Sequence, residues 1–253
     1  MKTFLFIVLL MLGFNAPALP PMQATIPSCV LWNPYSEGTG TIAYDYSGHN
    51  AHGTLTKGAG NTLNLPLWTN GIMGGGIYFY GKDVNGVHTN WMYVTNAIPS
   101  LNDFTVSVWF KCLGYGGPTN GGGYDRILEN SYATGFGLMR FAENANQWNA
   151  FVVNSAANNP IKVTITDGVL HHLILIRSGT VGIVYADGGA ATTNATVPST
   201  ATLPTAMMAG SSIPGLGYNE FIGIVGDVRI FNRVLSTNEM WMLYGGGYGK
   251  GTQ

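Results

Sequence analysis

The chain has 253 residues and a formal net charge of −1; charged side chains make up only 9% of it, whereas hydrophobic ones make up 46%. A chain so close to neutral has no field strong enough to attract nucleic acid or an anionic membrane surface. The low charge is also unlike that of an average cytosolic protein. The 36 glycines lie between aromatic and β-branched residues, so they indicate many turns rather than disorder.

The N-terminal stretch has the pattern of a secretory signal peptide. A lysine precedes an apolar run at 4–14, and Ala16 and Ala18 supply small residues at positions −3 and −1 of a cleavage site. The run is too short to span a bilayer, which takes about 20 residues. We expect a signal peptide over residues 1–18, a leader over 19–29 and an extracellular protein without a membrane span. The alternative is an apolar arm that stays attached.

Short strand-like runs recur through the rest of the chain, and helical periodicity is nearly absent. Residues 104–110 show the pattern best, because apolar and small polar residues alternate there with a period of two. Further runs lie at 30–32, 76–80, 91–94, 126–128, 136–141, 149–153, 161–165, 171–177, 182–186 and 221–231. This spacing predicts an all-β, antiparallel two-sheet sandwich that forms one domain over residues 30–245.

One short helix is predicted near the C-terminus. Ser236 and Glu239 form a capping box, in which each side chain binds the backbone N–H of the other residue. Met240 and Leu243 then give the helix an apolar face. Glycines follow at 245–247, so we expect the tail, residues 246–253, to be flexible.

The two cysteines, Cys29 and Cys112, allow one disulfide in an oxidising compartment. Bridging requires Cα atoms within about 7 Å, which a sequence does not reveal. The alternative of two free, buried thiols therefore stays open.

Four segments carry family motifs in a fixed order. Residues 221–236 read FIGIVGDVRIFNRVLS, close to a family pattern F-x-G-x-I-D-[ED]-V-R-I-Y-N-R-A-L-S. Residues 43–55 are similar to an early D-x-S-G…G-T-L segment, 103–111 to an F-T-[IV]-S-x-W-[VF] strand, and 170–188 to W-H-H-V-A…L-Y-V-D-G. Together they resemble the laminin-G-like jelly rolls of the concanavalin A-like lectin/glucanase superfamily. The resemblance implies a jelly-roll sandwich.

Several conspicuous residues in these motifs are expected to be structural. His171 and His172 are neighbours in a strand and face opposite sides of the sheet, so they cannot both ligate one metal ion. Residues 187–189, Asp-Gly-Gly, are a hairpin-turn signal. Trp109 and Tyr185 are expected to be core or near-core aromatics.

Asp45 has two interpretations. Its carboxylate can cap the amides of its own loop, as in an Asx-turn. The resemblance instead implies a structural calcium ion near the sandwich edge, for which carboxylate and carbonyl oxygens are suitable ligands. Asp45 would be its main ligand and Asp227 a weaker second one. Gly226 stands where many relatives have a second acid, which weakens the case for Ca²⁺.

No catalytic arrangement stands out in the sequence. Glucanases of the same superfamily carry paired carboxylates on one strand in an E-x-D-x-E-like spacing, because glycoside hydrolysis needs two carboxyl groups about 5–10 Å apart. No glutamate of this chain stands in such a pattern. Carboxylates from separate strands can still converge, but the sequence favours a protein that is not an enzyme.

Sugar binding needs aromatic faces and planar polar groups, and loops are where a rigid sandwich usually carries them. Trp91 and Trp148 stand beside asparagine-rich stretches, so with Tyr124 and Asn146 they are the predicted glycan-binding residues. The alternative for each aromatic is a structural place at the sandwich edge.

Two functions follow from this fold. One is a secreted, lectin-like carbohydrate-binding domain whose partner is a glycan. The other is a structural or adhesive protein of a cell surface or virion, which uses the sandwich as a scaffold for a cell-surface or assembly partner. The fold alone does not choose between them.

Overall fold

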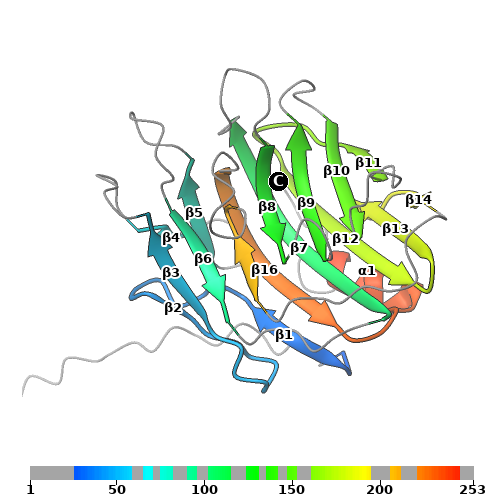
Figure 1. Cartoon of the computed structure of the whole chain (residues 1–253), viewed down its shortest axis with the longest axis horizontal. Coiled ribbons are helices and arrows are strands. Elements are labelled where there is room, and N and C mark those ends of the chain that lie inside the picture. Colours follow the sequence, from blue (N-terminus) through cyan, green and yellow to red (C-terminus); the bar gives the residue numbers. More distant parts are fainter. Residues whose placement is uncertain are drawn as a thin grey trace, which may run out of the picture.

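The computed structural model describes residues 26–58, 65–70, 75–81, 90–95, 102–114, 124–130, 135–141, 147–152, 161–194, 206–211 and 221–245. Within these ranges the chain forms two antiparallel sheets, stacked face to face, and one short helix (Figure 1). The predicted all-β sandwich with a C-terminal helix is confirmed. The predicted signal peptide and tail lie outside the described residues.

Sheet A has the strand order β14-β13-β12-β7-β16-β5-β4, and β1 also pairs with β16. The long strands β7 and β16 form its centre. Its strands are β1 (Cys29–Asn33), β4 (Leu67–Thr69), β5 (Gly76–Tyr80), β7 (Phe104–Gly114), β12 (Leu170–Ser178), β13 (Val181–Ala186), β14 (Thr192–Asn194) and β16 (Ile222–Phe231).

Sheet B has the order β11-β10-β9-β8-β15-β6-β3-β2. Its strands are β2 (Ile42–Ala43), β3 (Gly53–Lys57), β6 (Asn90–Val94), β8 (Tyr124–Glu129), β9 (Phe136–Phe141), β10 (Gln147–Val152), β11 (Ile161–Thr164) and β15 (Met207–Ala209). In each sheet, strands far apart in the sequence lie side by side, so neither face is encoded by one segment.

The main core fills the space between the sheets. Phe104, Val106, Val108 and Phe110 of β7 alternate onto this side and are fully buried. Aromatic rings meet across the two layers, as for Phe104 and Phe136, whose ring centroids are 5.4 Å apart. Burial of each such side chain contributes about 1.5–3 kcal/mol.

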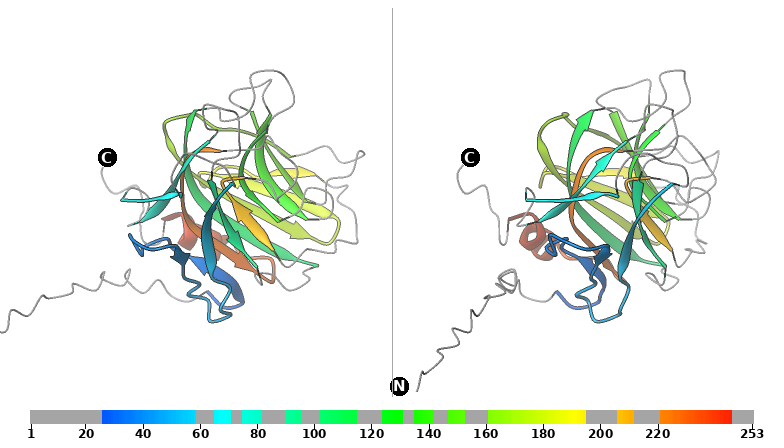
Figure 2. Two further views of the ribbon diagram at one scale, coloured as in Figure 1. Left: turned by 60° about the vertical axis from the view of Figure 1, so that its left-hand side comes forward. Right: turned by 90° about the vertical axis from the view of Figure 1, so that its left-hand side faces the viewer.

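The helix α1 (Thr237–Gly245) covers the outer face of sheet A, on the side away from sheet B (Figure 2). Its capping box is confirmed: the Ser236 N–H donates to Glu239 Oε2 over 2.8 Å, and the Glu239 N–H donates to Ser236 Oγ over 3.4 Å. Among the described residues, the structure has no helix with the length and apolar character of a bilayer span.

Because α1 covers this face, β7 is buried on both sides. Phe104 and Trp109 have opposite parity, so Phe104 points between the sheets while Trp109 points outward beneath the helix. Trp109 stacks on His172 and on Tyr244 there, with ring centroids 4.6 and 5.9 Å away. Trp109 is buried, as expected, but it lies between sheet A and the helix and not in the core between the two sheets. Tyr185 of β13 is half-buried and lies in this outer layer too.

Candidate functional site

Of the four residues predicted to bind glycans, the structure describes the side chains of two. Trp91 lies on β6, half-buried, on the outward face of sheet B. Trp148 is wrongly predicted: it lies on β10 with 1% of its surface exposed, in the core between the sheets. The strand alternation turns its ring inward, 5.6 Å from that of Phe110. The side chain of Tyr124 and all of Asn146 lie outside the described residues.

Of the two alternatives for the cysteines, the structure shows two free thiols, with Cys112 buried and Cys29 half-buried. Cys29 on β1 pairs with Phe231 of β16, which in turn pairs with Thr105 of β7. Cys112 is seven residues further along β7, so the two cysteines lie about 23 Å apart along the strand direction. Burial raises the pKa of each thiol to about 12.

Asp45 caps its own loop, as one of its two interpretations predicted. Its carboxylate accepts hydrogen bonds from the backbone N–H groups of Trp32, Ser47 and Ala51 at 2.9–3.0 Å, and from the Ser47 hydroxyl at 2.8 Å. Although burial works the other way, these N–H donors hold the pKa of Asp45 below its ordinary value. Four donors use about all the lone-pair directions of a carboxylate.

Asp227 is likewise committed to other groups. It sits in a bulge of β16, accepts a 2.8 Å hydrogen bond from the Trp32 indole N–H, and forms an ion pair with Arg229 at 3.1 Å. The Arg229 guanidinium lies over the Trp32 ring, 4.5 Å from its centroid.

The described residues therefore do not fit the structural calcium ion that the resemblance implied. Both proposed ligands, Asp45 and Asp227, already have donors or a cation on their oxygens. Within the described ranges, no three His, Cys, Asp or Glu side chains gather into a metal-binding group.

The histidine pair is structural and faces both sides of β12, as predicted. Asp187, in the turn after β13, accepts from the backbone N–H of His172 at 2.8 Å and bonds His171 Nδ1 at 2.7 Å. Burial lowers the pKa of His172 to about 3, so this ring is neutral. The opposite holds for His171, where the Asp187 contacts outweigh burial and raise the pKa.

The outward face of sheet B gathers polar and aromatic side chains that the sequence alone does not place together. A bulge in β8 between Arg126 and Leu128 adds one residue to the strand. Arg126 and Glu129, three residues apart, therefore both point outward and form a buried ion pair, with 3% and 1% of their surfaces exposed. A regular strand would turn them to opposite faces.

The strand register places further residues beside this ion pair. Arg126 pairs through Met139 of β9 with Asn149 of β10, so all three face outward. Asn149 is 2% exposed, and its Oδ1 accepts no hydrogen bond from any residue that the structure describes. A buried carbonyl oxygen without a donor is uncommon, because leaving it so costs about 1–3 kcal/mol.

Aromatic rings flank these polar groups. Phe151 of β10 lies directly over Gly137 of β9, where a side chain on the glycine would collide with the ring. Gly137 pairs with Glu129, and the same row continues through β15 to Tyr93 of β6, next but one to Trp91. The strip from β10 to β6 crosses four interstrand steps, about 19 Å.

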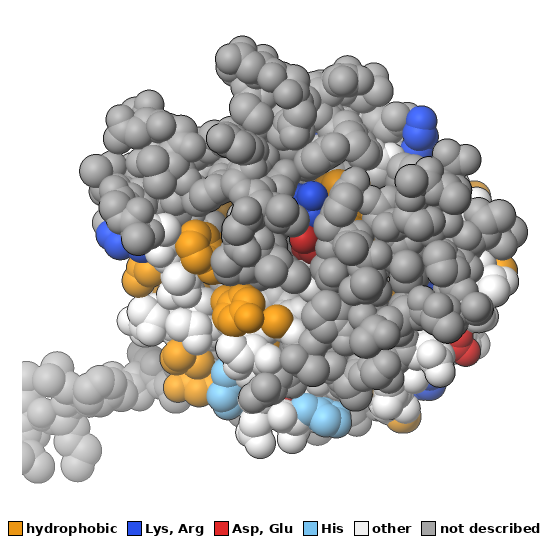
Figure 3. All heavy atoms as spheres, in the orientation of Figure 1, with side chains coloured by type: hydrophobic (Ala, Val, Ile, Leu, Met, Phe, Trp, Pro, Cys, Tyr) orange, Lys and Arg blue, Asp and Glu red, His pale blue; other side chains and the backbone are white. Residues whose placement is uncertain are grey.

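Figure 3 looks onto this face of the molecule. Basic and acidic side-chain atoms are visible side by side near its middle, over β8 and β9, and hydrophobic side chains are visible over β6. We call the set Trp91, Tyr93, Arg126, Glu129, Asn149 and Phe151 the sheet B strip.

Elsewhere in the structure, two carboxylates bind one guanidinium. Asp125 and Asp167 both bind the guanidinium of Arg140, and Asp125 is fully buried. Asp125 is also four residues before Glu129, but the two lie on opposite faces of sheet B, because Asp125 pairs with the inward-facing Arg140.

A family model described as the concanavalin A-like lectin/glucanases superfamily matches residues 85–240. A search of curated proteins finds no match.

Solved structures with the same fold are only distantly similar in sequence. One of them, described by the statement that cell entry of botulinum neurotoxin type C depends on interaction with two ganglioside molecules, has a TM-score of 0.63 at 14% identity, and the match covers 86% of this chain and 50% of that one. The receptor-binding domain of botulinum neurotoxin type G has 0.61 at 12% identity, over 86% and 51%. The chain thus spans about half the length of these toxin domains.

Domain 4 of AbnA, a GH43 extracellular arabinanase from Geobacillus stearothermophilus, has a TM-score of 0.54 at 16% identity. The match covers 86% of this chain and 98% of that domain, whose structure contains arabinotriose. These similarities show the jelly-roll fold.

Proposed function

Because the chain belongs to the concanavalin A-like lectin/glucanase superfamily, we propose that it is a non-catalytic carbohydrate-binding domain that acts outside the cell. The sheet B strip is the proposed sugar site, with the half-buried Trp91 at its β6 end.

The observation that carries this proposal is the set of polar groups buried on an outward sheet face. Arg126, Glu129 and Asn149 are planar groups that can hydrogen-bond two neighbouring hydroxyls at once. A sugar hydroxyl that donates a hydrogen bond to Asn149 Oδ1 would satisfy this buried acceptor. Trp91 and Phe151 then offer ring faces to the C–H groups of the sugar.

The comparisons support a sugar ligand to different degrees. The match covers nearly the whole length of the arabinanase domain, which is in complex with arabinotriose. This supports an oligosaccharide ligand. The type C toxin chain, whose description names two ganglioside molecules, is about twice as long as the matched region. Either half of it can bind them, so this structure gives weaker support.

The test is a glycan array with the full chain, followed by calorimetry with the best glycan and with arabinotriose. We expect Trp91→Ala to weaken binding at least tenfold, because it removes a ring face. Asn149→Ala should weaken binding similarly without lowering the melting temperature, since the lost oxygen accepts no hydrogen bond from any of the described residues.

The matched control is Trp241→Ala, which removes an exposed tryptophan from the helix on the opposite side of the molecule. It should bind glycan like the parent protein. If no glycan binds while the protein forms a discrete oligomer, the proposal is wrong and the scaffold function gains support. Equal loss in Trp91→Ala and Trp241→Ala would also contradict the assignment of the strip.

A further inference from the structure

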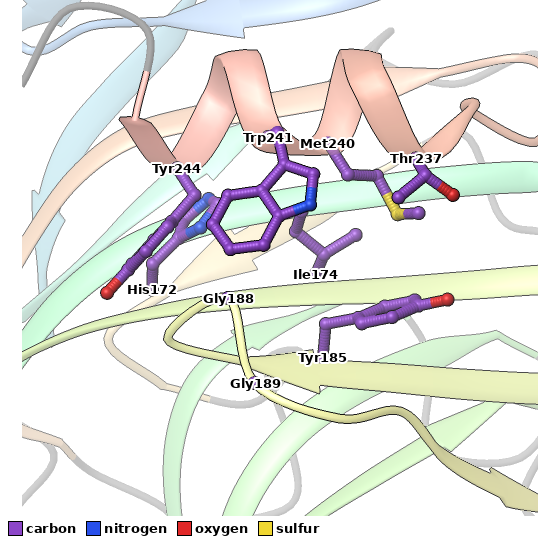
Figure 4. Close-up of a pocket in the computed structure, with 9 residues that line it drawn as sticks. All are labelled: His172, Ile174, Tyr185, Gly188, Gly189, Thr237, Met240, Trp241 and Tyr244. Atoms are coloured by element: carbon purple, nitrogen blue, oxygen red, sulfur yellow. The ribbon is translucent and has the colours of Figure 1, made fainter. Parts of the chain in front are cut away.

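A separate cavity of about 180 Å³ lies on the other side of the sandwich, between α1 and the outer face of sheet A. Figure 4 shows its walls: Trp241 and Met240 from the helix, Tyr185 from β13 on the opposite side, and Ile174 of β12 behind them. The glycine turn after β13 closes one end. We call this space the helix cavity.

The local sequence builds this cavity from a turn that needs glycine. Gly188 has a φ of +66°, and a Cβ there would lie 2.7 Å from the Tyr244 ring and 3.1 Å from the Trp241 ring. The turn therefore packs directly against both rings. Tyr244 is itself stacked on His172, with centroids 5.8 Å apart, so this end of the cavity is fixed by packing.

The volume of the cavity corresponds to one ring. Sites for drug-sized molecules measure about 300–1,000 Å³, and an engineered apolar cavity of about 150 Å³ binds benzene. The volume of the helix cavity is close to the second of these values. An oligosaccharide is too large for it.

The chemistry of the walls limits the occupant further. The lining residues are His, Ile, Tyr, Gly, Thr, Met and Trp, and the histidine, His172, is neutral because it is buried. No lining side chain can balance a charged ligand, whose desolvation would be costly. The side-chain hydroxyls of Thr237, Tyr185 and Tyr244 are too few for the many hydroxyls of a free sugar.

The outer rim of the cavity is an exposed aromatic side chain. Trp241 is 52% exposed and its neighbour Met242 is 43% exposed, although both lie on a helix that packs against the sheet. Large aromatic residues at such positions often anchor a ligand or partner group.

We propose that the helix cavity binds one uncharged aromatic ring between Trp241 and Tyr185. The ring is that of a free small molecule, since the cavity volume of about 180 Å³ is close to that of a site that binds benzene. This proposal does not depend on the sugar site, which lies on the opposite face.

The experiment titrates the ¹⁵N-labelled full chain with indole and, separately, with N-acetyl-L-tryptophanamide, while amide and indole N–H signals are followed by NMR. We expect saturable shifts of the Trp241 indole N–H and of Gly188 and Gly189. We expect indole to saturate these shifts at a concentration at least tenfold lower than N-acetyl-L-tryptophanamide does. Equal binding of the two probes would contradict the proposal and assign the ring to a side chain of a partner.

Variants make the outcome decisive. Trp241→Ala should weaken indole binding at least fivefold, whereas Trp241→Phe, which keeps a ring, should restore much of it. The matched control Trp91→Ala should bind indole like the parent chain. The proposal fails if indole causes no saturable shift at these signals, if Trp241→Ala binds it unchanged, or if methyl β-glucopyranoside binds there as well as indole does.

Discussion

His172 is a titratable side chain that the fold keeps neutral. Its ring stacks on Trp109, bonds the Ser107 hydroxyl over 2.8 Å and is 1% exposed. Burial lowers its pKa from the ordinary 6.5 to about 3. In the unfolded chain the ring takes up a proton near pH 6.5, whereas in the folded chain it does not. The unfolded state therefore binds more protons below pH 6.5, and acid favours unfolding.

We predict that the free energy of unfolding falls by about 1.5 kcal/mol between pH 6.5 and pH 5.0 because of this one group. The stability is fully present above pH 6.5 and is lost as the pH falls towards 3. Urea denaturation at both pH values measures it. In His172→Gln, which cannot titrate, the difference should largely disappear; an equal difference in this variant would show that another group is responsible.

Single residues also show where sequence reasoning ends. Trp91 and Trp148 have the same kind of neighbours in the sequence, yet one faces outward and the other lies in the core. They differ only in which face of sheet B their position in the strand points to. Because both tryptophans were predicted to lie in loops, this difference could not be predicted. The capping role of Asp45 could be predicted, because an Asx-turn depends on residues close by in the chain.

At the scale of elements, α1 is held at its start by local polar contacts. Besides the capping box, the Arg233 guanidinium binds Glu239, and mainly for this reason the pKa of the Glu239 carboxyl is lowered to about 2. The helix carries the walls of the helix cavity, so its first turn positions Met240 and Trp241.

We predict that Ser236→Ala destabilises the protein by about 1 kcal/mol, because it removes the side-chain acceptor for the Glu239 N–H. Asn238→Ala, at an exposed position in the same turn, is the matched control and should change the free energy of unfolding by less than about 0.5 kcal/mol. Chemical denaturation measures both. Equal effects of the two substitutions would mean that the cap contributes nothing specific.

The longer strands were predictable and the shortest were not. Every predicted run falls on a strand, and β5 and β9 have the predicted bounds. The strands β2, β4, β14 and β15 have only two or three residues, too few to show a period. The five-residue strand β3 was missed as well, because its sequence GTLTK has a single large apolar residue. The bulge in β8 was also invisible, because it depends on the register with β9.

At the scale of the whole molecule, the two stacked sheets hold together without a disulfide. The chain's only cysteines are both free, and their thiols donate to nearby backbone carbonyls, Cys29 to Leu31 and Cys112 to Gly114. The stability of the sandwich therefore rests on its buried side chains.

We predict that dithiothreitol leaves the melting temperature unchanged, because there is no disulfide to reduce. A thiol reagent should count two thiols in denaturant without any reductant, and should react slowly with the folded protein, since Cys112 is buried and both pKa values are raised to about 12. A count below two, or a melting temperature lowered by reductant, would contradict the structure.

The fold could be predicted from the sequence because alternation and family motifs are local patterns. The sheet B strip could not, because its members come from β6, β8 and β10 and meet only through the strand order of the sheet. Of its members, only Trp91 was among the four predicted glycan-binding residues.

The placement of α1 on one outer layer, with the strip on the other, has a consequence for assembly. If both ligands are bound, the domain becomes a two-sided coupler: a glycan-coated surface on one side and a ring-bearing molecule on the other are held one sandwich thickness apart. Binding to the glycan-coated surface then raises the effective concentration of the ring-bearing molecule near that surface, although the two ligands do not touch each other.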